Sequence, residues 1–196
     1  MLVQAEESHG VLRALLPSLG NLIHDRVERV RLAAVRLLLK VKSIKGIKYY
    51  HVVPVQHLLA RLAEEGRAPR NPTNPVASGL TALMMNSYFP QEANGVEQVK
   101  RSLALMSSDP IAATVFYSNL ASHLAVNSCA KLVAMMLKCL VAAVDNDKDH
   151  SSSDIEDDPL TPANTGLMAT LAESICSLWE SVSCGFDVLK QAVNIY

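Results

Sequence analysis

Residues 15–39, LLPSLGNLIHDRVERVRLAAVRLLL, decide the fold of this chain. Apolar residues recur at helical spacing on both sides of His24 and Asp25, which predicts two helices joined by a tight turn. In the second helix, Leu32, Val35 and Leu39 form an apolar arc separate from the main one. The main arc contains Val27, Val30, Ala34, Leu37, Leu38 and Val41. Because a helix that is apolar on two sides has neighbours on both, we expect stacked helices.

The composition also favours a helical protein. Hydrophobic residues make up 49% of the 196 residues and charged residues 19%, so the chain can bury a core without disulfides or metal. Aromatic residues are only 5%, a balance that favours helices over strands. The cysteines, Cys129, Cys139, Cys176 and Cys184, form no CxxC pair, and we expect reduced thiols. The predicted class is all-α.

Nothing near the N-terminus predicts secretion or membrane insertion. Glu6 and Glu7 stand where a signal peptide carries basic residues, and no apolar run approaches the roughly 18 residues of a membrane span. We therefore expect a soluble intracellular protein with no membrane partner. The net charge of −1 places any electrostatic function in a local patch.

Further helices follow one another with short links. Their boundary signals include prolines in first turns, the N-cap candidates Asn74 and Asp109, and Gly66 just past a helix end. The predicted helices cover residues 54–65, 75–87, 95–106, 110–123, 125–144 and 165–182, and another begins at residue 187. This series predicts a HEAT/armadillo-like α-solenoid of antiparallel helix pairs.

One long break divides the predicted helices. Residues 145–164, DNDKDHSSSDIEDDPLTPAN, combine low hydrophobicity with concentrated charge, which indicates a flexible acidic, Ser-rich loop. The expected organisation is HEAT-type repeats in residues 1–144, the loop in 145–164, and a further repeat in 165–196 that is cut off at the chain end.

The acidic loop contains candidate phosphorylation sites. Ser151 and Ser153 each have an acid three residues further on, and Thr161 precedes a proline, as acidophilic and proline-directed kinases require. Phosphate there would repel DNA or recruit a basic surface; an unregulated spacer fits the composition equally well. The acids at 145, 147, 149 and 156 match the spacing of a calcium loop, but His150 replaces its essential glycine, so we predict no calcium site.

The first helix pair matches the general HEAT pattern: a proline in the first helix, an aspartate in the turn, and Val-Arg and Ala in the second helix. The matching residues are Pro17, Asp25, Val30, Arg31, Ala34 and Leu38. We expect Pro17 to bend the first helix, Asp25 to accept hydrogen bonds from N–H groups of the turn, and Arg31 to reach turn acids of adjacent repeats.

A longer resemblance involves YYHVVPVQHLLARL at residues 49–62 and NSYFP at residues 86–90. With the first helix pair, these segments resemble the HEAT-repeat G subunit family of condensin II, most clearly over residues 10–130. The resemblance implies a nuclear, non-catalytic subunit that binds the kleisin subunit, other condensin II subunits and DNA or chromatin during mitotic chromosome condensation. ATPase chemistry would then lie in the SMC partners.

Although the net charge of the chain is close to zero, residues 25–48 form a locally basic segment. They contain eight basic residues and only two acidic ones, Asp25 and Glu28. On a helical wheel, Arg26, Arg29, Arg36 and Lys40 share one arc that contains no carboxylate. Such a basic stripe suits a phosphate backbone, which makes these four residues the DNA-contact candidates. A solvated helix face that balances acids elsewhere in the array is the alternative.

Catalysis finds no support in the sequence. The six histidines are scattered, without HExxH or a His/Cys cluster, and the glycines form no phosphate loop. We therefore predict no catalytic residues, metal, cofactor or small-molecule substrate. Two alternatives to the condensin II interpretation remain. The first is a HEAT-repeat adaptor without DNA contact, of the transport-receptor or phosphatase-scaffold type, and the second is a helical enzyme domain of an unrecognised kind.

Overall fold

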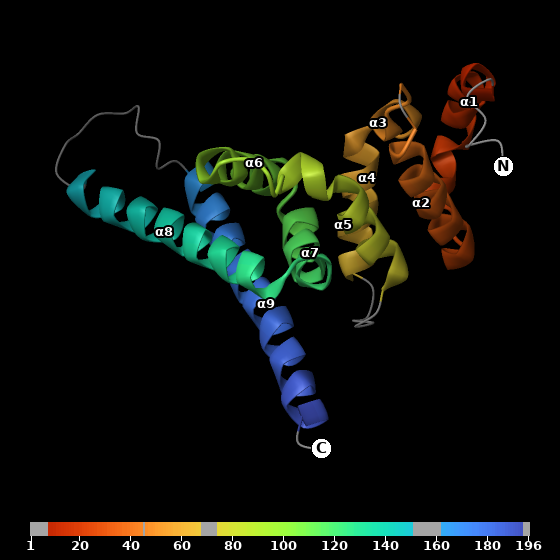
Figure 1. The fold of residues 1–196 in the computed structure, drawn as a ribbon. Helices are drawn as coiled ribbons and strands as arrows, with labels where there is room; N and C mark the ends of the chain where they lie inside the picture. The colour runs from red at the N-terminus through yellow and green to blue at the C-terminus, as the bar shows by residue number, and fades with distance from the viewer. Residues whose placement is uncertain (1–7, 45, 68–73, 151–161, 194–196) are drawn as a thin grey trace. The chain divides into compact units, whose positions relative to one another are not determined.

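The computed structural model describes residues 8–44, 46–67, 74–150 and 162–193. The chain forms two compact units, Met1–Asn86 and Ser87–Tyr196. Within the described residues every regular element is a helix, which confirms the all-α class (Figure 1).

The first unit begins with a helix that changes type at Pro17. Its elements are α1 (His9–Leu15), the 3-10 helix η3 (Leu16–His24), α2 (Glu28–Lys42), α3 (Tyr49–Val52), α4 (Val55–Arg67) and α5 (Pro75–Tyr88), whose last two residues pass the boundary between the units. Since Pro17 has no N–H to donate, the α-helix ends just before it and the chain continues as η3. Asp25 Oδ1 then accepts the Val27 N–H at 2.7 Å in the turn, as predicted.

Helices of the first unit pack against one another through buried apolar residues. η3 contacts α1, α2, α3 and α4, and α2 meets α5 where a Cβ added to Gly79 would lie 2.6 Å from Val35 Cγ1. Val35, Leu58, Leu62 and Leu80 are fully buried, and each such side chain contributes about 1.5–3 kcal/mol to the free energy of unfolding. The two apolar sides predicted for α2 therefore both find partners.

The second unit contains α6 (Gly95–Ser108), α7 (Pro110–Leu120), the short 3-10 helix η4 (Ala121–His123), α8 (Val126–His150) and α9 (Pro162–Val193). α7 contacts α6 and α9, and α9 also contacts α8. Its core includes Phe116 and Tyr117 of α7. Asp109 Oδ1 accepts the Ala112 N–H at 2.9 Å, and Asn74 Oδ1 in the first unit accepts the Ala77 N–H at 3.1 Å, so both predicted N-caps are confirmed.

Several predicted boundaries were wrong. α8 runs six residues into the segment predicted as a loop, and α9 begins at Pro162 inside it. α9 also continues through Ser183, Cys184 and Gly185, where a break was predicted, and α4 includes Gly66. One glycine costs a helix only about 1 kcal/mol, which propagation and packing elsewhere in the helix outweigh. Ser151, Ser153 and Thr161 lie outside the described residues.

The statement that no apolar run approaches the length of a membrane span was also wrong. Val126–Val144 of α8 is 19 residues long and apolar enough to qualify by length and composition, although core helices of soluble proteins can do the same. Sequence reasoning missed this run because Asn127, Lys131 and Lys138 interrupt it.

Candidate nucleic-acid interface

The basic stripe lies on the solvent side of α2. Arg29, Arg36 and Lys40 follow one another at intervals of seven and four residues, which places them on one face, and all three are exposed. They span roughly 16 Å along the helix axis at ~1.5 Å per residue. Ala33 lies on the same face, is also exposed, and leaves a gap without charge between Arg29 and Arg36.

Arg26 does not belong to this helical face, contrary to the wheel prediction. α2 begins at Glu28, and Arg26 lies in the bend before it, because the Asp25 side chain closes the turn there. Its side chain is exposed, while its backbone carbonyl accepts a hydrogen bond from Arg31 Nη1 at 3.0 Å. Arg26 is therefore not a fourth cation on the helix. It is a cation in the bend that precedes the N-terminal end of the stripe.

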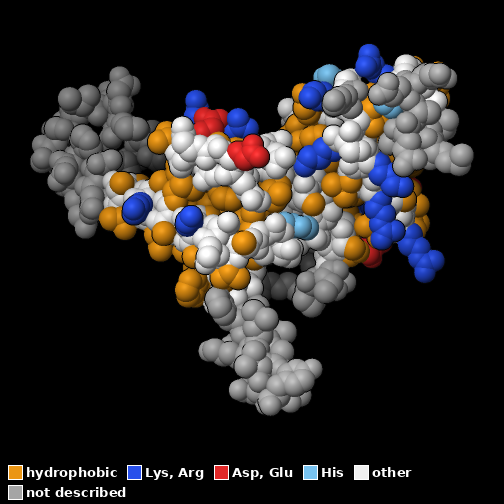
Figure 2. All heavy atoms as spheres, in the orientation of Figure 1, with side chains coloured by type: hydrophobic (Ala, Val, Ile, Leu, Met, Phe, Trp, Pro, Cys, Tyr) orange, Lys and Arg blue, Asp and Glu red, His pale blue; other side chains and the backbone are white. Residues whose placement is uncertain are grey.

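The four candidate cations differ from the paired arginines of the chain. Within the described residues, no carboxylate oxygen lies within 4 Å of Arg26, Arg29, Arg36 or Lys40. Figure 2 shows Lys and Arg side chains gathered over α2. Arg29 lies in the first turn of α2, where the helix dipole disfavours cations. The acidic residue of that turn is Glu28. The face is therefore a region of positive potential open to solvent.

Arg31 has a structural role, as predicted: it links α2 to α4, although its acid, Glu65, lies within α4 and not in a turn. Its Nε donates to Oε1 of Glu65 on α4 at 2.8 Å, and its Nη1 donates to the Asp25 carbonyl at 3.0 Å. Glu65 is buried and also accepts from Asn74 Nδ2 at 2.9 Å, while Arg61 Nε lies 3.0 Å from the same Oε1. Sequence reasoning did not find Glu65, because the contact joins residues 34 positions apart.

Lys42 is directed away from the stripe. Its Nζ donates to the carbonyls of Ala82 and Leu83 on α5, at 3.1 and 2.9 Å. Burial lowers the pKa of this ammonium group. Of the basic residues counted in the sequence patch, Arg31 and Lys42 thus donate hydrogen bonds within the fold and are only partly exposed.

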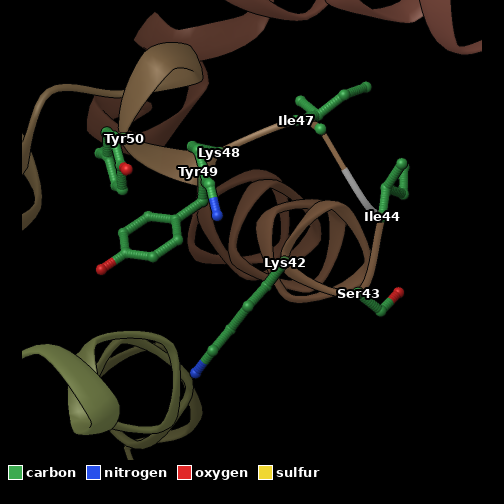
Figure 3. A pocket seen from close by; sticks show the side chains of 8 residues that line it. Lys42, Ser43, Ile44, Ile47, Lys48, Tyr49 and Tyr50 are labelled. Carbon is green, nitrogen blue, oxygen red and sulfur yellow. The ribbon is translucent and has the colours of Figure 1, made fainter.

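The C-terminal end of α2 borders a hollow of about 300 Å³, lined by residues 42–44 and 46–50. Figure 3 shows Lys42 extending toward α5, with Tyr49 and Tyr50 nearby. Its described lining contains no carboxylate, histidine or cysteine. Lys48 and the tyrosine hydroxyls of the lining are hydrogen-bond donors that suit an anion, whereas the Lys42 ammonium already donates to α5.

A histidine pair joins η3 to α4. His24 Nε2 and His57 Nδ1 are 3.2 Å apart, and the rings meet edge to face. Burial lowers the pKa of His24 below its ordinary value of 6.5, His57 and Arg61 lower it further, and Glu64 acts in the opposite direction. No group of three or more His, Cys, Asp or Glu that could hold a metal occurs in the described part of the chain, and Cys129, Cys139 and Cys176 are free thiols.

The curated proteins that resemble this chain share one description. The chain is 34% identical over 182 residues to the condensin-2 complex subunit G2 of Danio rerio, covering 89% of the chain and 15% of that protein. It is 30% identical over 207 residues to the subunit of that name in Homo sapiens, covering 98% of the chain and 17% of the relative. It is 31% identical over 197 residues to the subunit of that name in Mus musculus, covering 94% of the chain and 16% of the relative.

The chain therefore spans only a small part, 15% to 18%, of the length of these relatives. No family model matches the chain, and no solved structure matches it.

Proposed function

We propose that this chain, which belongs to the family of condensin-2 complex subunit G2 as a segment of it, is part of a non-catalytic HEAT-repeat scaffold that binds DNA through the phosphate backbone. The solenoid arrangement is supported in the first unit by the contacts of η3 with α4 and of α2 with α5. The Arg31–Glu65 pair joins the same two helix pairs. Such an array presents long helix faces to other macromolecules.

The observation that carries the DNA proposal is the row of cations on α2 that have no ion-pair partner among the described residues. Arg29, Arg36 and Lys40 lie over roughly 16 Å of helix, which corresponds to about five base-pair steps at 3.4 Å per phosphate along one strand. Arg26 extends the row at one end. The helix fixes the backbone spacing of these cations, so that only their side chains must be ordered when phosphates bind.

The α2 face favours backbone contact over base reading. Between the cations, Ala33 offers no hydrogen-bonding side chain for a base edge and no ring for a base to stack on. Contacts to phosphate position a protein on DNA without reading its sequence. The expected activity is therefore sequence-independent binding of duplex DNA.

The partners of the assembly follow from the relatives. Since the relatives are described as subunits of the condensin-2 complex, we propose that the full-length protein joins the other condensin II subunits, the kleisin among them, on nuclear chromatin. Its role there is to support mitotic chromosome condensation, with neither a small-molecule substrate nor a membrane partner. Co-purification of the kleisin with the full-length protein tests this part.

Charge reversal with a matched control tests the DNA proposal. Arg29→Glu, Arg36→Glu and Lys40→Glu are combined, and binding of a fluorescent DNA duplex is measured by anisotropy. The control combines Lys100→Glu, Lys131→Glu and Lys138→Glu, which changes the net charge equally through exposed lysines of the other unit. We expect the stripe variant to lose binding and the control to keep it. Equal losses in both variants contradict a localised site.

A protein-only adaptor is the second candidate. It is favoured by an exposed apolar face on α8, described below, which suits a protein partner and not DNA. If the wild-type chain fails to bind DNA while circular dichroism shows it folded, the α2 face is a solvated surface and the adaptor proposal replaces the first.

Phosphorylation of Ser151, Ser153 and Thr161 remains a proposal from the sequence alone. Treatment of the chain with an acidophilic and a proline-directed kinase, followed by mass spectrometry of the peptides that span residues 145–164, tests it. If DNA affinity also falls after modification, the added negative charge acts against the basic stripe.

A further inference from the structure

An apolar row runs along the outer side of α8. Its members are separated by three or four residues and are all exposed: Val126, Ala130, Ala134, Leu137, Val141 and Val144. We call these six residues the α8 seam. Leu137 is 44% exposed and Val141 57%. On a helical wheel the seam fills an arc of about 80°, the width of one helix-packing face.

The packing of α8 within its own unit uses a different side of the helix. Cys129, Leu132, Val133 and Met136 are buried, and α8 contacts α6 and α9. Met136 borders Leu103 of α6 and Leu171 of α9 around a small cavity. Because the buried residues fill another arc of the wheel, the core of this unit does not explain why the α8 seam is apolar.

Between residues 126 and 144, the charges beside the α8 seam have one sign. Residues 126–144 contain no acidic residue, while Lys131 and Lys138, seven residues apart and exposed, border the seam along one flank. Figure 2 shows the hydrophobic side chains over α8 interspersed with blue ones. An occupant with acidic groups along the corresponding edge would complement both the apolar row and its charged border.

We propose that the α8 seam binds an amphipathic helix of a partner protein, with an apolar stripe on the seam and acidic residues facing Lys131 and Lys138. From Ala130 onward the seam residues alternate at four and three residues, the spacing of knobs-into-holes packing between helices, whereas an extended peptide would present side chains at every second residue. The seam extends over roughly 27 Å, the length of an 18-residue helix. The proposal is independent of the DNA-binding function, because the seam lies in the other unit.

A pair of designed peptides tests the proposal with the whole chain. The first is a fluorescent peptide of about four heptads with Leu at a and d and Glu at e and g, whose like charges keep it from pairing with itself; the second has Lys at e and g. Anisotropy titrations measure the binding of each. We expect the acidic peptide to bind the chain more tightly than the basic one, by roughly tenfold for two favourable charge contacts.

Variants locate the binding site. Leu137→Glu combined with Val141→Glu is expected to abolish binding of the acidic peptide, whereas Val96→Glu, at a 79% exposed apolar position on α6, leaves it unchanged. Lys131→Glu combined with Lys138→Glu keeps the apolar seam and reverses its border, so the chain should then prefer the basic peptide. This exchange of preference remains informative even if the double seam variant folds poorly.

Several results overturn the proposal. If the chain binds neither peptide, the α8 seam is not a helix-binding site. The same follows if the Leu137/Val141 variant binds the acidic peptide as tightly as the wild-type chain does. Sedimentation of the chain alone as a dimer that the same variant dissociates assigns the seam to a second copy. Binding of phosphatidylcholine vesicles that depends on Leu137 and Val141, without peptide binding, assigns it to a lipid surface.

Discussion

Arg31 Nε lies 2.8 Å from Oε1 of Glu65, and this ion pair joins α2 to α4. The side chain of Glu65 is only 4% exposed, so its charge depends on protein partners and not on water. The basic residues of α2 therefore differ in their surroundings: Arg31 links α2 to α4, while Arg29, Arg36 and Lys40 remain open to solvent.

Removal of Arg31 is expected to destabilise the chain. Arg31→Ala should lower the free energy of unfolding by about 2–3 kcal/mol, somewhat less than for a buried pair broken outright, because Arg61 and Asn74 still contact Glu65. Urea unfolding followed by circular dichroism measures the change. The control, Arg101→Ala, removes a pair that is about 40% exposed on both sides and should cost less than ~1 kcal/mol. Equal effects of the two variants would refute the structural role of Arg31.

Close packing at Gly20 gives a second prediction. A Cβ at this position would lie 2.6 Å from the Val52 carbonyl oxygen, and since that atom is backbone, α3 must move. Gly20→Ala should therefore destabilise the chain by about 1–3 kcal/mol. Gly10→Ala, with nothing within 4 Å of the new Cβ, should be neutral or stabilise by up to ~1 kcal/mol. If thermal unfolding shows no difference in stability between Gly20→Ala and Gly10→Ala, the close contact of η3 with α3 is refuted.

The His24–His57 pair makes stability depend on pH. Because burial first, and then His57, lower the pKa of His24 below 6.5, the unfolded chain binds more protons than the folded one once the pH falls through this value. The contribution of this histidine is complete above pH 6.5 and is lost as the pH decreases toward the lowered pKa. His24→Gln should flatten the plot of urea midpoint against pH below 6.5, and His51→Gln should not. An unchanged slope in His24→Gln argues against the prediction.

The gap at Ala33 allows a gain-of-function test of the stripe. Ala33→Lys adds a cation between Arg29 and Arg36, so DNA binding should strengthen and its salt slope should steepen by about one phosphate contact. Ala104→Lys adds the same charge at an exposed position on α6 and serves as the control. If both variants gain equally, net charge and not the α2 face governs binding.

Local signals in the sequence predicted the parts of the fold that depend on neighbouring residues. The Asp25 turn and the caps at Asn74 and Asp109 involve bonds over two or three residues, and all three occur in the structure. The four-residue helix α3 was not predicted, because so short an element carries no periodic signal.

Long-range contacts and the limits of helices were harder to predict. Glu65 and Gly20 act through residues 34 and 32 positions away, which no local pattern reveals. For the candidate interface, the exposure of Arg29, Arg36 and Lys40 followed from helical periodicity. Arg26 was misplaced because the wheel assumed that the helix began before Glu28.

The dependence of DNA affinity on salt tests the central claim most directly. For wild type, the logarithm of the association constant should fall against the logarithm of the salt concentration with a slope of roughly −3, since three or four phosphates release their counterions on binding. In the Arg29→Glu, Arg36→Glu, Lys40→Glu variant, binding should be lost or the slope should approach zero. Wild-type binding with no salt dependence, or an unchanged slope in the variant, would contradict the assignment of α2 as the DNA-binding face.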